Sequence, residues 1–473
     1  MEKIPVVLKP LNDPQVLSGS FRDPSGFLFR HNGILYRQIN PAYGLEYEHL
    51  MSSGLYKDLV RREYLIPHEE VEAGRFNLPS AHRVIQPTLV SFISYPYEWC
   101  FGQLKEAALL TLEIQRIASG FGMALKDASA YNVQFLNGKP IWIDTLSFER
   151  SGEGQPWVAY RQFCQHFLAP LALAAFGDPR LVQLSRIFLD GIPLDLASSL
   201  LPFRTRWNLP ISAHLHLHSM AQKHLSRFQA PTNTLRVSSK GLKGLLDHLH
   251  STVHSLRWNP LRTSWSDYYE TSIYSSVSLE TKRRIVETFL SEIHPPPGIA
   301  WDLGANTGRF SQIPASRGIL TVAMDADPAC VEHNFRQMRK DGEKNLLPLV
   351  VDLANPSSSQ GWAHQERLSL TERGPADVVL ALALIHHLAI GNNLPFKNIA
   401  GWLRHLGSWL IIEFVPKTDP QVSRLLASRK DTFPEYHSRG FEVAFEESFI
   451  LLNRVPIAGT GRTLYRMCAK ATP

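Results

Sequence analysis

Ten residues, Trp301-Asp302-Leu303-Gly304-Ala305-Asn306-Thr307-Gly308-Arg309-Phe310, predict a strand that ends in an acid, a tight glycine turn and the start of a helix. Gly304 permits the turn, and Gly308 lets the helix pack closely against the sheet. Such a turn points free backbone N–H groups at a ligand, and Asp302 adds a carboxylate at the end of the strand. The segment therefore predicts an α/β domain that binds a nucleoside or a dinucleotide.

Later apolar runs predict the rest of a sheet. They lie at residues 318–324, 347–352, 376–384, 409–415, 448–455 and 462–470, and helical patterns, one of them at 421–429, separate them. Asp325 follows the first of these runs, where an acid would bind ribose hydroxyls, and Asp352 ends the second. The alternation predicts a doubly wound parallel sheet, and the terminal pair of strands does not suit a dehydrogenase domain.

From about residue 265 to its C-terminus, the chain resembles class I S-adenosylmethionine-dependent methyltransferases. The loop at 302–308 matches their first motif, Asp325 their ribose-binding acid, and Asp352 the acid near the adenine. Asn306 stands where many members have a second glycine, and asparagine tolerates positive φ. The resemblance implies S-adenosylmethionine as the cofactor, bound by Asp302, Gly304, Asn306, Gly308, Asp325 and Asp352. The whole chain also resembles large bacterial methyltransferase-like proteins, some of them associated with nodulation.

An aromatic segment, Trp265-Ser266-Asp267-Tyr268-Tyr269-Glu270, precedes a predicted helix at 278–293. In the methyltransferases that the chain resembles, the segment just upstream of the first strand often covers the cofactor. Tyr269 is therefore a candidate for packing over the methionine end of the cofactor. The alternative is that the segment is an aromatic anchor between domains.

Three residues at predicted strand ends are candidates for catalysis. His386 and His387 follow the fourth strand, and histidine titrates near neutral pH, so either can act as a base towards the methyl acceptor. The alternative for this pair is a role in shaping the pocket floor. Glu413, at the end of the fifth strand, also faces the expected acceptor side. The four cysteines lie far apart without metal-binding spacing, so we expect no metal in this site.

The N-terminal half carries a second pattern. Asp127 and Asn132 are followed by two apolar runs joined by Asn137-Gly138, which predicts a tight hairpin, and then by Asp144. This order resembles the catalytic loop of protein-kinase-like phosphotransferases, with Asp127 at the catalytic acid position. The resemblance puts Asn132 and Asp144 at the positions of the metal ligands.

Departures from this second resemblance are substantial. Arg37 stands where a lysine is expected, no full glycine-rich phosphate loop is present, and Thr145-Leu146 replaces the usual Phe-Gly. We therefore predict a degenerate kinase-like domain, an α+β unit at 1–200, that recruits or positions the methyl acceptor. Active phosphotransfer, another fold, and a simple cap-and-turn role for Asp127 and Asn132 are the alternatives. On this prediction, removing the domain leaves cofactor affinity nearly unchanged.

Residues 201–262 are strongly basic, although the net charge of the chain is only +6. Asp247 is the only acid among them. The segment predicts a helical connector that either attracts an anionic partner such as RNA or is simply solvated. Three alternating histidines, His214, His216 and His218, have no nearby carboxylate or cysteine, which disfavours a metal site. The basic residues are Arg204, Arg206, Lys223, Arg227, Arg236, Lys240, Lys243, Arg257 and Arg262.

The sequence thus predicts a chain of 473 residues with a kinase-like domain at 1–200, the connector, and a methyltransferase domain at 263–473. The expected activity is methyl transfer from S-adenosylmethionine to an unidentified small molecule, protein or RNA. An NAD-dependent oxidoreductase and a non-enzymatic interaction protein are the alternatives. No apolar run approaches the roughly 20 residues that span a bilayer, and the first residues lack a signal peptide, so we expect a cytoplasmic protein without membrane contact.

Overall fold

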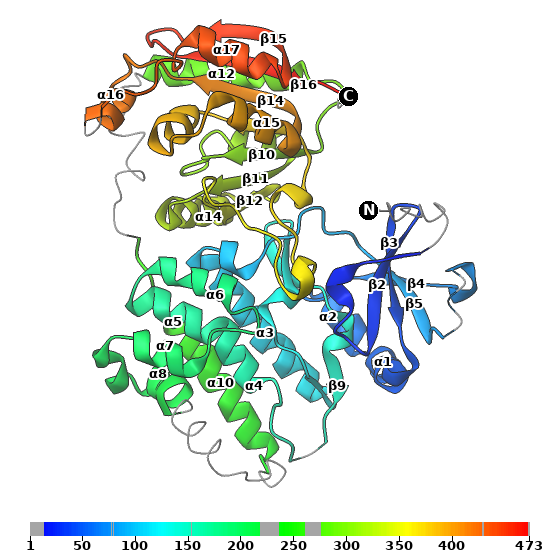
Figure 1. The fold of residues 1–473 in the computed structure, drawn as a ribbon. Helices are drawn as coiled ribbons and strands as arrows, with labels where there is room; N and C mark the ends of the chain where they lie inside the picture. Colours follow the sequence, from blue (N-terminus) through cyan, green and yellow to red (C-terminus); the bar gives the residue numbers. More distant parts are fainter. Residues whose placement is uncertain are drawn as a thin grey trace, which may run out of the picture.

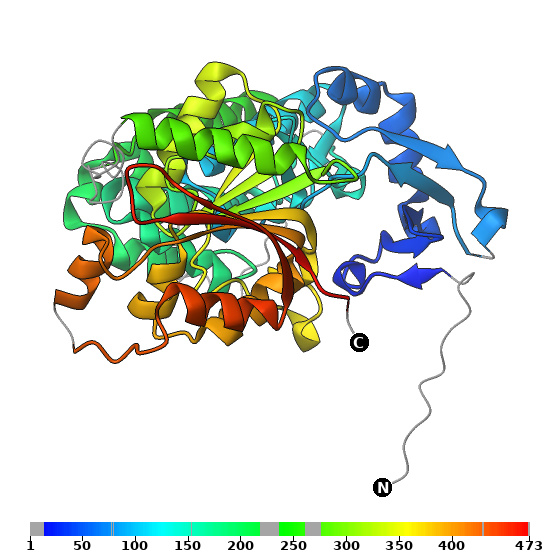
Figure 2. The ribbon, with the colours of Figure 1, turned by 90° about the horizontal axis from the view of Figure 1, so that it is seen from above.

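The computed structural model describes residues 14–76, 78, 80–152, 154–217, 236–260, 276–427 and 430–471. Figure 1 shows a C-terminal α/β unit stacked on a helical lobe, with a small β lobe beside them. Seen from above, the β lobe extends to one side of the sheet (Figure 2). The predicted Tyr269 and the aromatic segment around it lie outside the described residues.

The C-terminal unit contains a seven-stranded sheet in the order β12-β11-β10-β13-β14-β16-β15. The first five strands are parallel to one another, and β16 pairs antiparallel with both β14 and β15. The expected doubly wound sheet and its terminal strand pair are thereby confirmed. The strands are β10 (Ile299–Leu303), β11 (Leu320–Asp325), β12 (Leu346–Val350), β13 (Ala376–Ala381), β14 (Gly407–Phe414), β15 (Phe449–Pro456) and β16 (Thr463–Ala469).

Helices cover both faces of this sheet because its side chains alternate between them. Val378 and Ile411 face the side covered by α12 and α13, whereas Val379 and Leu410 face α15 and α17. Against β11, α14 closes the first side through Phe335. The helices are α12 (Ser276–Ser291), α13 (Gln312–Ala315), α14 (Pro328–Asp341), α15 (Phe396–Leu406), α16 (Pro420–Ala427) and α17 (Ser438–Glu446).

Two elements in this unit have bounds that differ from the prediction. The helix after the glycine turn, α13, begins only at Gln312 and has four residues. Pro314 has no N–H with which to extend a helix from the turn, and Gly318, at φ +81°, directs the chain into β11. The fourth strand ends at Ala381, three residues before the expected end at 384, since Ala383 adopts a positive φ of 53°.

The β lobe is a five-stranded antiparallel sheet in the order β1-β2-β3-β5-β4. It contains the hairpin of β2 and β3 and is flanked by α1 and α2. The small β lobe precedes a helical lobe along the chain, while kinase-like character stays a prediction. The elements are β1 (Gln15–Val16), β2 (Gly26–His31), β3 (Ile34–Ile39), β4 (His68–Val71), β5 (Arg83–Pro87), α1 (Gly44–Ser52) and α2 (Leu55–Arg61).

The helical lobe is built on α3, a 20-residue helix (Phe101–Gly120). The hairpin predicted at Asn137-Gly138 is present, because both residues adopt positive φ between β7 and β8. A π-helical turn, Cys164–Leu168, lies between two short α-helices. The other elements are β6 (Met123–Leu125), β7 (Val133–Leu136), β8 (Lys139–Trp142), β9 (Phe148–Arg150), α4 (Tyr160–Phe163), α5 (Ala169–Phe176), α6 (Leu184–Ile187), α7 (Leu194–Leu200) and α8 (Leu209–Ile211).

The described part of the basic segment at 201–262 belongs to the helical lobe rather than standing free. Helix α10 (Ser239–Ser255) packs along α3 and buries Leu246, Leu249 and Val253. Its basic residues occupy the opposite, exposed face, as in an amphipathic helix. No helix among the described residues is long and apolar enough to cross a membrane.

His214 and His216 contact different partners. His214 contacts the Tyr160 hydroxyl and His248 Nδ1, both at 2.7 Å, whereas His216 contacts the hydroxyls of Ser198 and Thr205. His218 lies outside the described residues. Across the described part of the chain, no group of three or more His, Cys, Asp or Glu side chains is arranged to hold a metal ion.

Candidate functional site

The order of the strands places the switch point of the sheet between β10 and β13, and this order predicts a ligand crevice at the carboxyl ends of the two strands. From β10, the chain moves outward through β11 and β12 in one direction and through β13 and β14 in the other. In doubly wound sheets, ligands bind at this switch point. Asp302, Asp325, His386 and Glu413 all lie at the strand ends or directly beyond them, so the fold brings the predicted residues to one edge.

The glycine turn depends on its backbone conformation at three positions. Gly304, Asn306 and Gly308 have φ angles of 73°, 52° and 81°. A Cβ on Gly308 would lie only 2.2 Å from Asn334 Oδ1 on α14, so a larger residue would push α14 away from the sheet. The Gly304 amide donates to the Met324 carbonyl at 2.9 Å, which holds the turn against the end of β11.

Asp325, the last residue of β11, bonds the glycine turn to this strand. Its carboxylate accepts the Asn306 N–H at 2.8 Å and the Asp327 N–H at 2.9 Å. Burial raises the pKa of Asp325 to about 6, although these backbone donors act in the opposite direction. The residue is only partly buried, so its carboxylate is able to accept hydroxyl groups from a ligand.

Asp302 lies deeper than its neighbour. It is 2% exposed and accepts the Ser311 hydroxyl at 2.6 Å, from the turn that precedes α13. Burial raises the pKa of Asp302 to about 6 as well. The carboxylate therefore lies beneath the glycine turn, where it places a negative charge and accepts a hydrogen bond from Ser311.

Glu413 is enclosed in an ion cluster. Its carboxylate lies 2.6 Å from Lys282 Nζ and 3.2 Å from Arg462 Nη1, and Arg462 also bonds Asp419 at 2.7 Å. Lys282 and Glu413 are 2% and 0% exposed. Because two cations bind this carboxylate, Glu413 links α12, which carries Lys282, to the start of β16 near Arg462. Lys282 Nζ also lies 4.3 Å from the centroid of the Phe310 ring, at the end of the glycine turn.

The histidine pair follows β13 as two neighbouring rings, with centroids 4.1 Å apart. His386 is completely buried, and neither ring nitrogen has a hydrogen-bond partner among the described residues. Burial, with the nearby cations of Arg462 and Lys282, holds the pKa of His386 well below its ordinary value. Burial lowers the pKa of His387 to about 4. Both rings are therefore neutral at pH 7 and are weak bases.

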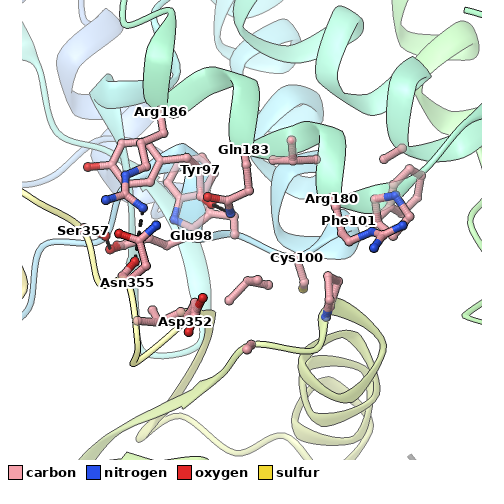
Figure 3. Close-up of a pocket in the computed structure, with 18 of the residues that line it drawn as sticks. Tyr97, Glu98, Cys100, Phe101, Arg180, Gln183, Arg186, Asp352, Asn355 and Ser357 are labelled. Carbon is pink, nitrogen blue, oxygen red and sulfur yellow. Dashed lines mark hydrogen bonds between the residues drawn. The ribbon is translucent and has the colours of Figure 1, made fainter. Parts of the chain in front are cut away.

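Asp352 lies just beyond β12 and is exposed, with its carboxylate accepting the Ala354 N–H at 2.9 Å. It lines a cavity of about 480 Å³ whose other wall comes from the N-terminal half (Figure 3). The lining residues of the N-terminal half belong to the helical lobe and to the segment just before α3, namely Tyr97, Glu98, Cys100, Phe101, Gln183 and Arg186. Those of the sheet unit are Ala326, Pro328, Val351, Asp352, Asn355 and Ser357.

Sequence reasoning missed several residues of the site. Lys282 lies in a helix with a charged surface pattern, so its burial beside Glu413 leaves no local signal. Arg462 was expected only as the first residue of a strand, and Ser311 only as part of a helix. The whole N-terminal wall of the cavity was also missed, because nothing near Tyr97 or Arg186 indicates a ligand.

No family model matches the chain. The nodulation protein NoeA of Rhizobium meliloti (strain 1021) is 34% identical over 460 residues, which cover 96% of each chain. The chain belongs to the NoeA family of nodulation proteins. This relationship covers both halves of the NoeA-family chain, including the cavity between them.

Three solved structures each match less than half of the NoeA-family chain. Magnesium protoporphyrin IX methyltransferase from Synechocystis PCC 6803, with bound SAH, matches 44% of the chain and 93% of its own, at 16% identity and a TM-score of 0.32. The N-methyltransferase NodS from Bradyrhizobium japonicum WM9 matches 42% and 99%, at 10% identity and 0.32. The bifunctional kinase-methyltransferase WbdD matches 43% and 41%, at 14% identity and 0.31.

Proposed function

We propose that the chain binds S-adenosylmethionine in the crevice at β10 and β13 and transfers its methyl group to an acceptor. The observation that carries the proposal is the contact between Asp325 and the Asn306 N–H. It joins a glycine turn of positive φ to an acid at the end of the second strand. A ligand that spans both features needs vicinal hydroxyls for the acid and a polar chain beside the turn.

The residues present fit such a ligand. Asp325 is partly exposed and would accept the ribose hydroxyls, while the turn at 304–308 brings backbone close to the sulfur-bearing chain. The cofactor supplies an intrinsically reactive sulfonium methyl group, so the protein chiefly has to orient the acceptor and exclude water. The Lys282–Glu413–Arg462 cluster serves this purpose by holding one wall of the crevice rigid.

His387, which is only partly buried, would meet the acceptor as a neutral ring, with the buried His386 ring packed beside it. With its pKa lowered to about 4 by burial, His387 can accept a hydrogen bond from an amine or hydroxyl and so direct its lone pair towards the methyl carbon. Either ring is a poor general base near pH 7. We therefore assign His387 to positioning the acceptor, whose proton leaves to solvent, and His386 to supporting the His387 ring.

The acceptor itself is a small molecule, a protein side chain or RNA. The relative is named as a nodulation protein, and one structural neighbour is named as an N-methyltransferase and another as a kinase-methyltransferase. We propose that the N-terminal half, as a degenerate kinase-like domain, recruits or positions the acceptor, and that the protein works in the cytoplasm.

A thermal-shift comparison of S-adenosylmethionine, NAD and ATP tests the proposal on the full chain. A ligand present at 100 times its Kd stabilises the folded state by about 2.7 kcal/mol. We expect S-adenosylmethionine to raise the Tm, and NAD to leave it unchanged. A shift with NAD alone would select an oxidoreductase, and no shift with any of the three would select a non-enzymatic interaction protein.

A further inference from the structure

The cavity of about 480 Å³ lies across the junction between the two halves of the chain (Figure 3). Its floor consists of residues that directly follow β11 and β12, namely Ala326 and Asp352. Its opposite wall comes from the segment at 97–101 and from the helical turns around Gln183 and Arg186. Residues that are far apart in the sequence therefore enclose one space.

The position of this space relative to Asp325 indicates what it holds. Ala326 is the next residue after Asp325 and lines the cavity, so a base attached to a ribose at Asp325 extends into it. Val351 and Pro328 provide apolar surfaces for a planar ring, and the amide of Asn355 lies beside them. The volume falls within the range of about 300–1,000 Å³ that is typical of small-molecule sites.

We propose that the N-terminal half forms one wall of the adenine site, so that the cofactor is bound by both halves together. This inference rests on the proposed function, since it assigns residues to the adenine end of the same ligand. The assigned wall consists of the segment at 97–101, Gln183 and Arg186. None of these residues belongs to the methyltransferase-like part of the sequence.

Direct contacts show that this wall also holds the floor in place. Arg186 donates to the carbonyl oxygens of Asn355 and Pro356, at 3.3 and 2.9 Å, in the loop that carries Asp352. Gln183 Nε2 donates to the Tyr97 carbonyl at 2.6 Å, which links the two parts of the wall. Arg186 is thus a positioning residue, because it acts on the adenine through this loop.

The packing around the wall is that of a protein core. Cys100 is 2% exposed and packs among residues of the sheet unit that include Phe335. A Cβ on Gly102 would lie 2.8 Å from the Phe335 ring, and the Gly102 N–H donates to Glu332 at 2.7 Å. These contacts bury part of each half against the other. The proposal therefore predicts that removing the N-terminal domain weakens cofactor binding, in contrast to the expectation from the sequence that affinity stays nearly unchanged.

Calorimetry on the full chain with S-adenosylmethionine, S-adenosylhomocysteine and adenosine tests the inference. Arg186→Ala and the space-filling Gln183→Trp should each weaken all three ligands at least tenfold and by similar factors, since the ligands share the adenine. Arg204→Ala is the matched control, because Arg204 also donates to a backbone carbonyl, that of Phe176, but does not line the cavity. It should bind all three ligands like the wild type.

Melting curves without ligand show which variants are folded, and Arg186→Lys and Gln183→Ala replace any variant that is not. The inference is overturned, and the proposed function stands, if the wild type binds the ligands, Asp325→Ala lowers their affinity, and the folded wall variants bind them as tightly as Arg204→Ala does. If the wild type binds none of the three, both are overturned.

Discussion

Glu98 and Arg373 form a buried, two-pronged ion pair that joins the N-terminal half to the sheet unit. The guanidinium donates to both carboxylate oxygens, at 2.6 and 2.8 Å, and the two side chains are 1% and 3% exposed. The Ser357 hydroxyl donates to the same carboxylate at 2.6 Å, and the guanidinium lies 4.8 Å from the centroid of the Tyr95 ring. Charge-assisted pairs of this geometry fix the register of two surfaces.

Removing either partner should destabilise both halves together. Glu98→Leu leaves the Arg373 cation buried and unpaired, and breaking a buried pair in this way costs about 3–5 kcal/mol. Urea unfolding followed by near- and far-ultraviolet circular dichroism should show this loss within one cooperative transition. The double variant Glu98→Leu/Arg373→Met should recover part of it. Two well-separated transitions in the wild type, or a loss below about 1 kcal/mol, would contradict this description of the junction.

Two glycines with the same φ separate backbone strain from crowding. Gly308 and Gly318 both have φ +81°, but a Cβ on Gly308 meets Asn334 at 2.2 Å, whereas a Cβ on Gly318 meets nothing within 4 Å. Gly318→Ala should cost about 1–2 kcal/mol through its backbone alone. Gly308→Ala should cost about 1–3 kcal/mol more because it is overpacked, and it should also abolish cofactor binding. Equal stability and equal binding of the two variants would show that the turn tolerates a side chain.

The part of this site that could be predicted depends on local patterns. Asp302, Asp325 and Asp352 each lie at or next to the carboxyl end of an apolar run, and the alternation of runs and helices is visible in sequence. The register of the sheet then brings Asp302 and Asp325 to one edge, as β10 pairs with β11. Predictions of this kind succeed because parallel strands share an edge whatever the rest of the chain does.

The remaining part depends on contacts that have no local signal. Glu98 and Arg373 are 275 positions apart. The sequence around each of them does not indicate that the charge is buried or which residue it pairs with. Lys282 would be expected on the surface of an amphipathic helix, yet it is buried because Glu413 lies beneath it. His214 and His216 alternate as if on a strand, but they belong to a π-helical turn that directs them to different partners.

Cofactor affinity should depend on pH through the two acids of the crevice. Burial raises the pKa of Asp302 and of Asp325 to about 6, above the ordinary value near 3.9. A protonated carboxyl offers fewer acceptor sites for ribose hydroxyls, so affinity should fall as pH is lowered through 6. For one group the loss is about tenfold at pH 5. Calorimetry from pH 5 to 8 should show a smaller pH dependence for Asp325→Asn, and constant wild-type affinity would contradict the assignment.

The N-terminal half should not turn over ATP. The Arg37 guanidinium already lies between two acids, 2.5 Å from Asp144 and 2.8 Å from Asp23, where a kinase-like site would need a metal ion. Phosphoryl transfer depends on metal neutralisation and on a lysine that this chain lacks, so most of the rate should be lost. Phosphate release with ATP and Mg²⁺ should equal that of Asp144→Ala. Sustained metal-dependent hydrolysis that disappears in Asp144→Ala would make the protein bifunctional.

Binding of S-adenosylmethionine to the full chain, measured by calorimetry for the wild type and for Asp325→Ala, tests the central claim most directly. The charged acceptor at Asp325 predicts that its removal weakens binding by about 1.5–3 kcal/mol, the scale of a hydrogen bond to a charged group. Asp341→Ala, which changes an exposed acid on the same unit, should bind like the wild type. Equal affinity of the wild type and Asp325→Ala, or a preference of the wild type for NAD, would contradict the assignment of this crevice.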